Sequence, residues 1–193
     1  MHRIYVTEGL VVGKRGVGES NTLALLFTRE LGLVRVSARS ARKEVSKLRF
    51  GLEPLTLARF SLVRGRHEWK LTGVERTSRS LLTTHHARRT QVGKILRLLL
   101  RLIHGEEPVP ELYVTLLSGI QHLVGVVEAR EAESVEYVLV LRILAHLGYV
   151  SQTPELVPYL TGDLAALETM QRVQTARHTL TRLINESLNA TGL

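Results

Sequence analysis

The residue types of this chain point first to contact with phosphate groups. Residues 35–49 read RVSARSARKEVSKLR and carry six basic residues against a single acid, Glu44. Each Lys or Arg that reaches a phosphate releases counterions, so this segment predicts salt-sensitive affinity with little dependence on base sequence. The alternative is a solvated loop with surplus charge. The six basic residues are Arg35, Arg39, Arg42, Lys43, Lys47 and Arg49.

A second basic cluster surrounds the only tryptophan, Trp69. It consists of Arg64, Arg66, His67 and Lys70. A basic hairpin with an aromatic side chain is typical of proteins that stack the bases of single strands. A lone tryptophan on a strand is more often part of a core, and we favour that interpretation. The three Lys and Arg residues remain candidates for phosphate contact.

A glycine-rich stretch, GKRGVGE at 13–19, has the composition of a phosphate loop but not its spacing. The Walker pattern requires Gly-Lys followed by Ser or Thr and then a helix, whereas here Gly18 precedes Glu19 and a strand follows. The glycines predict a tight connection between strands. Lys14 and Arg15 are expected to contact backbone phosphates.

Catalytic, metal and cofactor chemistry find little support in the sequence. The chain has no cysteine, its only aspartate is Asp163, and its histidines form no HExxH motif. Arg142 lies in an apolar stretch and needs an acceptor, either an internal acid such as Glu136 or the acidic tail of a partner, and we favour the internal acid. We predict a protein that is not an enzyme, with no catalytic residues, no metal and no cofactor.

The distribution of charge favours a polyanionic partner. The net charge is +8; residues 1–90 hold 18 Lys and Arg against 7 acids, and residues 91–193 hold 8 against 11. Charge confined to one half indicates a binding surface, either for nucleic acid or for an anionic membrane. The basic half has the pattern of strands rather than of an amphipathic helix, which favours nucleic acid. With no signal peptide and no apolar run that spans a bilayer, we expect a cytoplasmic protein.

The secondary structure that must position these residues is predicted to change from strands in the first part of the chain to helices in the second. Runs with a period of two predict strands at 4–12, 22–28, 33–39, 55–63 and 67–77. Five short strands predict a small closed barrel, since closure removes exposed edges. Apolar residues with a period of 3.6 then predict helices at 92–103, 113–127 and 134–147, and a last one from about 163. The fold class is therefore α+β, with a basic β-domain at 1–79 and a helical domain at 80–193.

Several segments, in order along the chain, resemble the RecO family of bacterial recombinational repair mediators. They are EGLVVGKRGVGESN at 8–21, LLFTRELGLVRVSARSAR at 25–42, LEPL at 52–55 and LRILAHLGY at 141–149. The resemblance implies an N-terminal OB-fold and a helical domain. It also implies binding to single- and double-stranded DNA, strand annealing and assistance to RecA loading in the RecF pathway, with RecR and single-strand-binding protein as partners.

One departure from the family pattern concerns zinc. Many RecO relatives carry a four-cysteine zinc module after the LGY segment, where this chain reads VSQTPELVPYLTGD at 150–163. The resemblance is thus to a short relative without a zinc finger. An OB-fold RNA-binding accessory protein is the alternative function, and a structural adaptor that presents its basic face to an acidic protein is a third.

Overall fold

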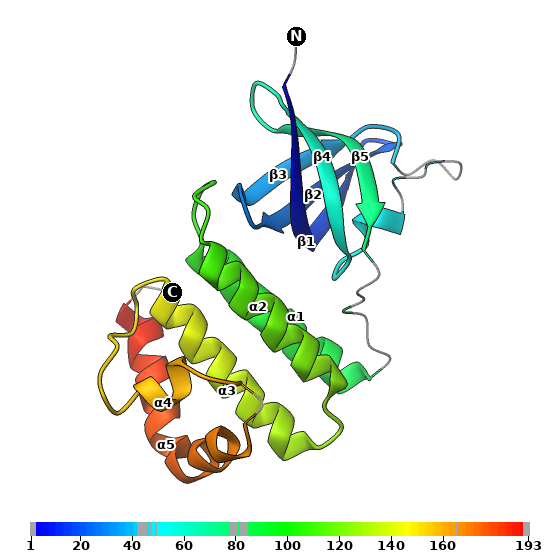
Figure 1. Ribbon diagram of the computed structural model, residues 1–193. Helices are drawn as coiled ribbons and strands as arrows, with labels where there is room; N and C mark the ends of the chain where they lie inside the picture. Colours follow the sequence, from blue (N-terminus) through cyan, green and yellow to red (C-terminus); the bar gives the residue numbers. More distant parts are fainter. Residues whose placement is uncertain are drawn as a thin grey trace. The chain divides into compact units, whose positions relative to one another are not determined.

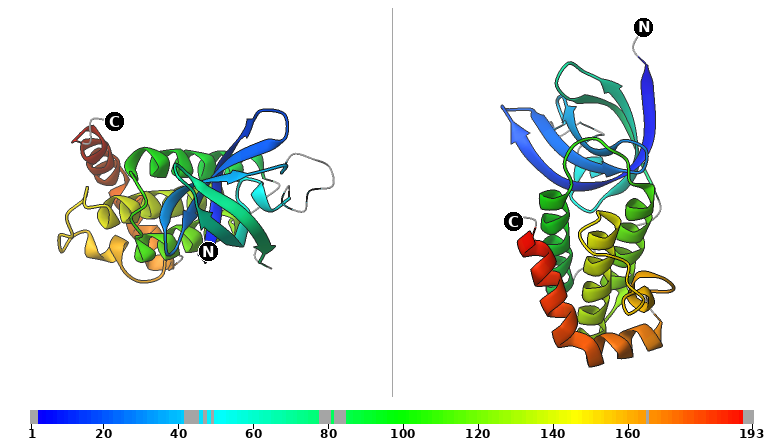
Figure 2. Two further views of the ribbon diagram at one scale, coloured as in Figure 1. Left: turned by 90° about the horizontal axis from the view of Figure 1, so that it is seen from above. Right: turned by 90° about the vertical axis from the view of Figure 1, so that its left-hand side faces the viewer.

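The computed structural model describes residues 3–41, 46, 48, 50–77, 81, 85–164 and 166–190. The chain divides into two compact units (Figures 1 and 2). The first comprises Met1–Leu82 together with His104–Tyr113, and the second comprises Thr83–Ile103 and Val114–Leu193. Each unit is described separately below.

The first unit is built on a closed five-stranded barrel with the neighbour order β1-β2-β3-β5-β4. The strands are β1 (Ile4–Val17), β2 (Asn21–Thr28), β3 (Gly32–Ala38), β4 (Leu57–Arg64) and β5 (Trp69–Arg76). All neighbours pair in antiparallel fashion except β3 and β5, which run parallel and close the barrel. The five predicted strands and the α+β class are confirmed, and the barrel is of the OB type.

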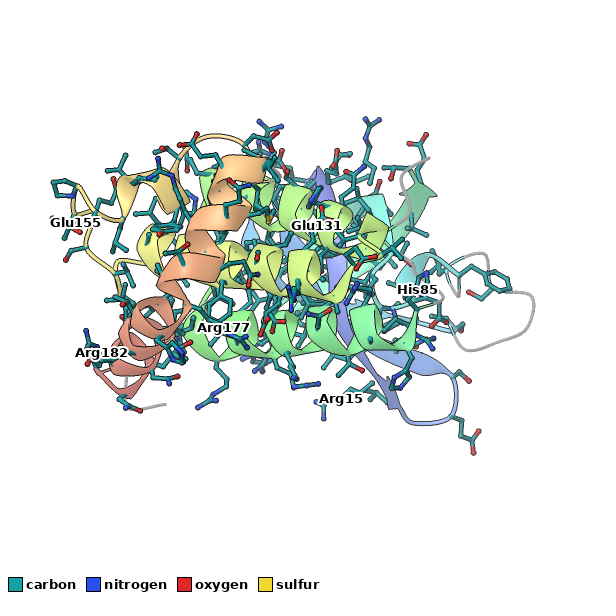
Figure 3. The ribbon with its side chains drawn as sticks, turned by 90° about the horizontal axis from the view of Figure 1, so that it is seen from below. Arg15, His85, Glu131, Glu155, Arg177 and Arg182 are labelled. Atoms are coloured by element: carbon teal, nitrogen blue, oxygen red, sulfur yellow. The ribbon has the colours of Figure 1, made fainter. Side chains whose placement is uncertain are left out.

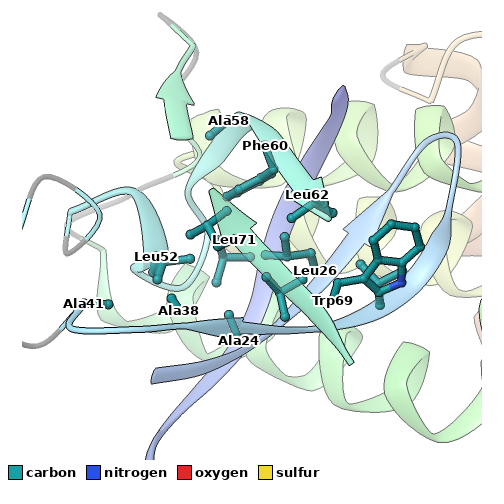
Figure 4. Close-up of a cluster of buried hydrophobic side chains, with 13 residues drawn as sticks. Ala24, Leu26, Ala38, Ala41, Leu52, Ala58, Phe60, Leu62, Trp69 and Leu71 are labelled. Carbon is teal, nitrogen blue, oxygen red and sulfur yellow. The ribbon is translucent and has the colours of Figure 1, made fainter. Parts of the chain in front are cut away.

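The barrel interior is filled by alternate residues of every strand, as a period of two requires. Figure 4 shows this core, in which Phe60, Leu26 and Leu62 are fully buried. A 3-10 turn, η1 (Phe50–Leu52), adds Leu52 to the core. Its Gly51 permits close packing, because a Cβ there would lie 2.7 Å from the Cγ atoms of Val74.

β1 is longer than predicted and contains a bulge. The prediction of a turn from Gly13 onward was wrong, because β1 continues to Val17 and the turn occupies only residues 18–20. Val11 pairs with Leu26 but Gly13 pairs with Leu25, so Val12 is an extra residue in the strand. The bulge resets the alternation, so that Lys14 and Arg15 point to opposite sides of the strand, and both side chains are exposed.

The second unit is a helical bundle. Its helices are α1 (His86–Leu102), α2 (Pro110–Gly125, whose first turn belongs to the first unit), α3 (Ala129–His146), α4 (Val157–Leu160) and α5 (Leu167–Ala190). α3 packs against α1, α4 and α5 and buries residues on nearly all sides, as its continuous apolar pattern predicted. α4 is not among the helices predicted from the sequence, since a single turn that contains Pro158 is too short to show a period of 3.6.

Arg142 on α3 connects elements of the bundle by donating hydrogen bonds to main-chain carbonyls. The expected pairing of Arg142 with Glu136 was wrong: Arg142 donates to the carbonyls of Tyr159 (2.8 Å) and Thr161 (2.9 Å). Glu136 instead accepts from Gln91 (2.9 Å). A carbonyl acceptor satisfies a half-buried guanidinium without a second buried charge, which explains why the acid is not needed.

Residues 104–113 follow α1 in sequence but pack with the barrel unit. The Tyr113 ring lies 5.7 Å from the ring of Phe27 on β2. At Gly32, whose φ is +66°, a Cβ would lie 2.4 Å from the Glu107 carbonyl oxygen. The barrel unit is therefore discontinuous along the chain. Among the helices of the described ranges, none has both the length and the apolar character needed to cross a membrane.

Candidate nucleic-acid interface

The outer surface of β1, β2, β3 and β5 brings together basic residues that are far apart in sequence. The strand register aligns Arg15 with Leu23, Leu23 with Ser37, and Ser37 with Lys70. Residues that pair directly across strands point to the same side of a sheet. Arg15 and Lys70 therefore lie at the two ends of one row that crosses four strands. The side chain of Arg15 is among those labelled in Figure 3.

β3 and the turn after it add two guanidinium groups beside this row. Arg35 lies two residues before Ser37 on β3, and Arg39 lies two residues after Ser37, in the turn that follows the strand. Val34 and Val36 on either side of Arg35 are fully buried, so the alternation turns Arg35 outward, and Arg39 is exposed. We call the four exposed cations Arg15, Arg35, Arg39 and Lys70 the barrel basic face.

Carboxylates are few on the strands that build the barrel basic face: β1 carries Glu8 near its start, and β5 carries Glu75, which pairs with Arg59. β2 and β3 contain no Asp or Glu, nor does the outer part of β1 from Gly9 to Val17. Within the described part of the chain, none of the four cations forms an ion pair. A surface with one sign of charge raises the local concentration of a polyanion and speeds its association.

Lys14 and Arg64, two other predicted contact residues, are engaged within the protein. Lys14 pairs with Glu53 at 2.7 Å. Arg64 pairs with Glu106, and its Cζ lies 4.9 Å from the centre of the Trp69 ring. Both ion pairs are partly exposed, so each is worth at most about 1 kcal/mol and a phosphate can compete with it.

The remaining predicted contact residues are divided between a loop and the undescribed part of the chain. Arg66 is exposed in the β4–β5 connection, where the Gly65 amide donates to the Glu68 carbonyl at 3.0 Å. Four predicted contact residues lie outside the described residues: Arg42, Lys43, Lys47 and Arg49.

Among the described aromatic side chains of the barrel unit, one ring is exposed, and the others are buried or packed against the core. The preferred interpretation of Trp69 as a core residue is confirmed, since its side chain is 5% exposed and packs edge-on against Tyr5 at 5.1 Å. Phe50, at the start of η1, is 63% exposed. Sequence reasoning missed Phe50, although an aromatic directly after the basic segment 35–49 was a usable signal. It is the candidate for stacking on a base.

The described residues contain no group of three or more His, Asp or Glu side chains arranged to hold a metal ion. The candidate site therefore consists of charge on the barrel wall with one exposed aromatic ring near it in sequence. Such an arrangement suits contact with a sugar–phosphate backbone more than reading of individual base edges.

Comparisons with known proteins agree with the fold. Residues 1–78 match the family described as "Recombination protein O N terminal". The "DNA repair protein RecO" of Heliobacterium modesticaldum is 32% identical over 148 residues, which cover 76% of this chain and 52% of the relative. That of Exiguobacterium sibiricum is 28% identical over 161 residues, which cover 80% of this chain and 59% of the relative.

A third similar protein is the "DNA repair protein RecO" of Alkaliphilus metalliredigens, 24% identical over 163 residues, which cover 84% of this chain. The chain spans about half the length of the curated relatives that it matches most strongly. The matched regions extend well beyond the barrel into the helices. The chain is thus similar to the RecO DNA repair proteins, and its residues 1–78 match the model of the N-terminal domain of that family.

Proposed function

We propose that this protein binds DNA through the barrel basic face and acts in recombinational repair as a mediator without catalytic turnover. The observation that carries the proposal is the group of exposed cations on β1, on β3 with the turn after it, and on β5, with no carboxylate on β2 or β3. Its similarity to DNA repair proteins favours DNA over RNA as the polyanion. All eleven predicted residues remain proposed DNA contacts, and the four of the barrel basic face have the strongest structural support.

The wider role that we propose is that of a RecF-pathway protein. In that role it binds single and double strands, anneals complementary strands and assists RecA loading, with RecR and single-strand-binding protein as partners. We also propose the domain division predicted from the sequence, with a DNA-binding domain in residues 1–79 and a helical domain without a zinc finger in residues 80–193. A strand-annealing assay with and without cognate single-strand-binding protein tests this role.

The salt dependence of DNA affinity tests the binding surface. Each cation that neutralises a phosphate of single-stranded DNA contributes about 0.7 to the slope of log K against log salt concentration. The double variant Arg35→Gln/Arg39→Gln should therefore lower that slope by roughly 1 to 2, measured by fluorescence anisotropy with a labelled oligothymidine.

The matched control is Arg29→Gln/Arg59→Gln, which removes the same charge from exposed positions of the same barrel outside this face. The control should keep most of the slope. Equal losses in both variants would mean that net charge, and not this face, determines the affinity. Competition between DNA and RNA of one sequence separates the proposal from the RNA-binding alternative.

A further inference from the structure

The exposed face of α1 carries a second concentration of positive charge, in the half of the chain that is acidic as a whole. α1 reads HARRTQVGKILRLLLRL and contains no Asp or Glu. Its exposed cations are Arg89, Lys94, Arg97 and Arg101, which we call the α1 stripe. The fifth basic residue, Arg88, is buried and binds the carbonyls of Val126, Val127 and Glu128.

The spacing of the α1 stripe places its members on one side of the helix. Arg89, Arg97 and Arg101 belong to a single row of residues four apart, in which Gly93 fills the remaining place. Lys94 lies beside this row. Over the twelve residues from Arg89 to Arg101 the helix rises about 18 Å, so the stripe presents charge along the length of several nucleotides.

The cations of the α1 stripe have no ion-pair partner among the described residues. Lys94 shares a hollow with Glu133 and Glu136, but these carboxylates are already engaged. Glu133 pairs with Arg177, and Glu136 accepts from Gln91. The contrast with α5 is informative, because the exposed Arg172 and Arg182 there each pair with a glutamate four residues away.

Gly93 adds a steric feature to the stripe. A Cβ at this position would meet only the Nη1 atom of Arg97, at 3.6 Å. Packing therefore does not require a glycine here, and the residue costs helix stability. It leaves the backbone bare between Arg89 and Arg97, where a phosphate can approach both guanidinium groups closely.

We infer that the α1 stripe is a second phosphate-binding surface of this protein and contacts the backbone of DNA. The inference rests on the proposed function and adds a surface on the other unit of the chain. DNA is favoured over an acidic peptide because α1 exposes no large apolar side chain that would anchor one. Recognition by charge alone along a straight stripe fits a regularly spaced polyanion.

The test is the triple variant Lys94→Gln/Arg97→Gln/Arg101→Gln in the full chain. We expect the slope of log K against log salt concentration to fall by about 2 for labelled oligothymidine, and the affinity at moderate salt to fall about tenfold. The charge-preserving variant Lys94→Arg/Arg97→Lys/Arg101→Lys should bind like the wild type. The matched control Arg172→Gln/Arg182→Gln should change affinity less than twofold, since those cations are already paired.

Three results would overturn the inference, and they are distinguishable. Unchanged binding in the triple variant, with loss in Arg35→Gln/Arg39→Gln, rejects the α1 stripe and leaves the proposed function intact. Salt-insensitive or absent DNA binding by the wild type rejects both. If the triple variant keeps its DNA affinity but no longer binds a glutamate-rich peptide that the wild type binds, the α1 stripe is a site for an acidic protein partner and not for DNA.

Discussion

Two helical glycines show how the same residue type serves opposite purposes. Gly119 on α2 lies against Leu139, and a Cβ there would be 2.6 Å from the Leu139 Cδ1 atom. Gly93 on α1 has no such neighbour. Close packing therefore requires the first glycine, whereas packing does not require the second, which lowers the helix propensity of α1.

Alanine substitutions should separate these two cases. Gly93→Ala should raise the free energy of unfolding by about 0.5 to 1 kcal/mol, because the unfolded chain loses freedom and nothing clashes. Gly119→Ala should lower it by about 1 to 3 kcal/mol through overpacking. Urea denaturation followed by circular dichroism measures both. A destabilising effect at Gly93 would contradict the open surroundings described for it.

Phe50 is the residue whose substitution should distinguish single from double strands. Its ring is exposed, so Phe50→Ala should leave stability within about 0.5 kcal/mol. Loss of one stacked base costs about 1 to 3 kcal/mol, so affinity for oligothymidine should fall at least fivefold. Affinity for a duplex, whose bases are already stacked, should stay within twofold. Phe50→Leu is the control, since it keeps apolar bulk without a ring; equal losses on both DNA forms would rule out stacking.

At the scale of elements, one buried and one half-buried arginine connect elements of the bundle through main-chain carbonyls. Arg88 on α1 donates to three carbonyls between α2 and α3, at 2.8 to 3.2 Å. Arg142 on α3 donates to the carbonyl of Tyr159 in α4 and to those of the two residues that follow α4, Thr161 and Gly162. Burial lowers the pKa of the Arg142 guanidinium, and the nearby Asp163 opposes that shift.

Removal of Arg88 should loosen the α2–α3 connection. Arg88→Met keeps much of the side-chain volume but leaves buried carbonyls without donors, so we expect a loss of about 2 to 4 kcal/mol in unfolding free energy. Arg89→Met is the matched control, because the adjacent side chain is exposed and should change stability by less than about 0.5 kcal/mol. Similar urea midpoints for the two variants would refute a joining role for Arg88.

The elements were the most predictable part of this protein, and their joints the least. A period of two or of 3.6 is a local signal, and it located all five strands and the four long helices. The bulge at Val12, the one-turn α4 and the carbonyl acceptors of Arg142 depend on residues distant in sequence, so no local pattern reveals them. The α1 stripe was missed for another reason. The net charge was summed over residues 91–193, and the eleven acidic residues there, none of which lies in α1, made the sum negative although α1 itself is basic.

At the scale of the whole molecule, two hydrophobic cores lie in one chain. Trp69 belongs to the barrel core and is the only tryptophan, so its fluorescence reports on the first unit alone. Far-ultraviolet circular dichroism is dominated by the helices, which lie mostly in the second unit. A chain with two cores need not unfold in one step, and these two probes can separate the transitions.

Tyr113 offers a test of how the first unit is assembled. It begins α2 in sequence but packs on Phe27 in the barrel unit. Burial, reinforced by Glu8 and Glu30, raises the pKa of its hydroxyl, which therefore stays protonated at neutral pH. Tyr113→Ala should destabilise the Trp69 transition by about 3 kcal/mol and the helical transition by less. Tyr113→Phe, which keeps the ring, should cost about 1 kcal/mol or less. If Tyr113→Ala shifts the unfolding transition seen by circular dichroism more than the one seen by Trp69 fluorescence, Tyr113 does not belong with the barrel unit.

The composition of the barrel basic face also bears on how the protein would move along DNA. In the proposed function its cations contact a backbone that is chemically the same at every nucleotide, and no aromatic ring lies on β2 or β3 at the exposed positions. Nothing on this wall favours one position along a strand over the next. We therefore expect a protein that travels along DNA by sliding and short hops, with a residence time that shortens steeply as salt rises.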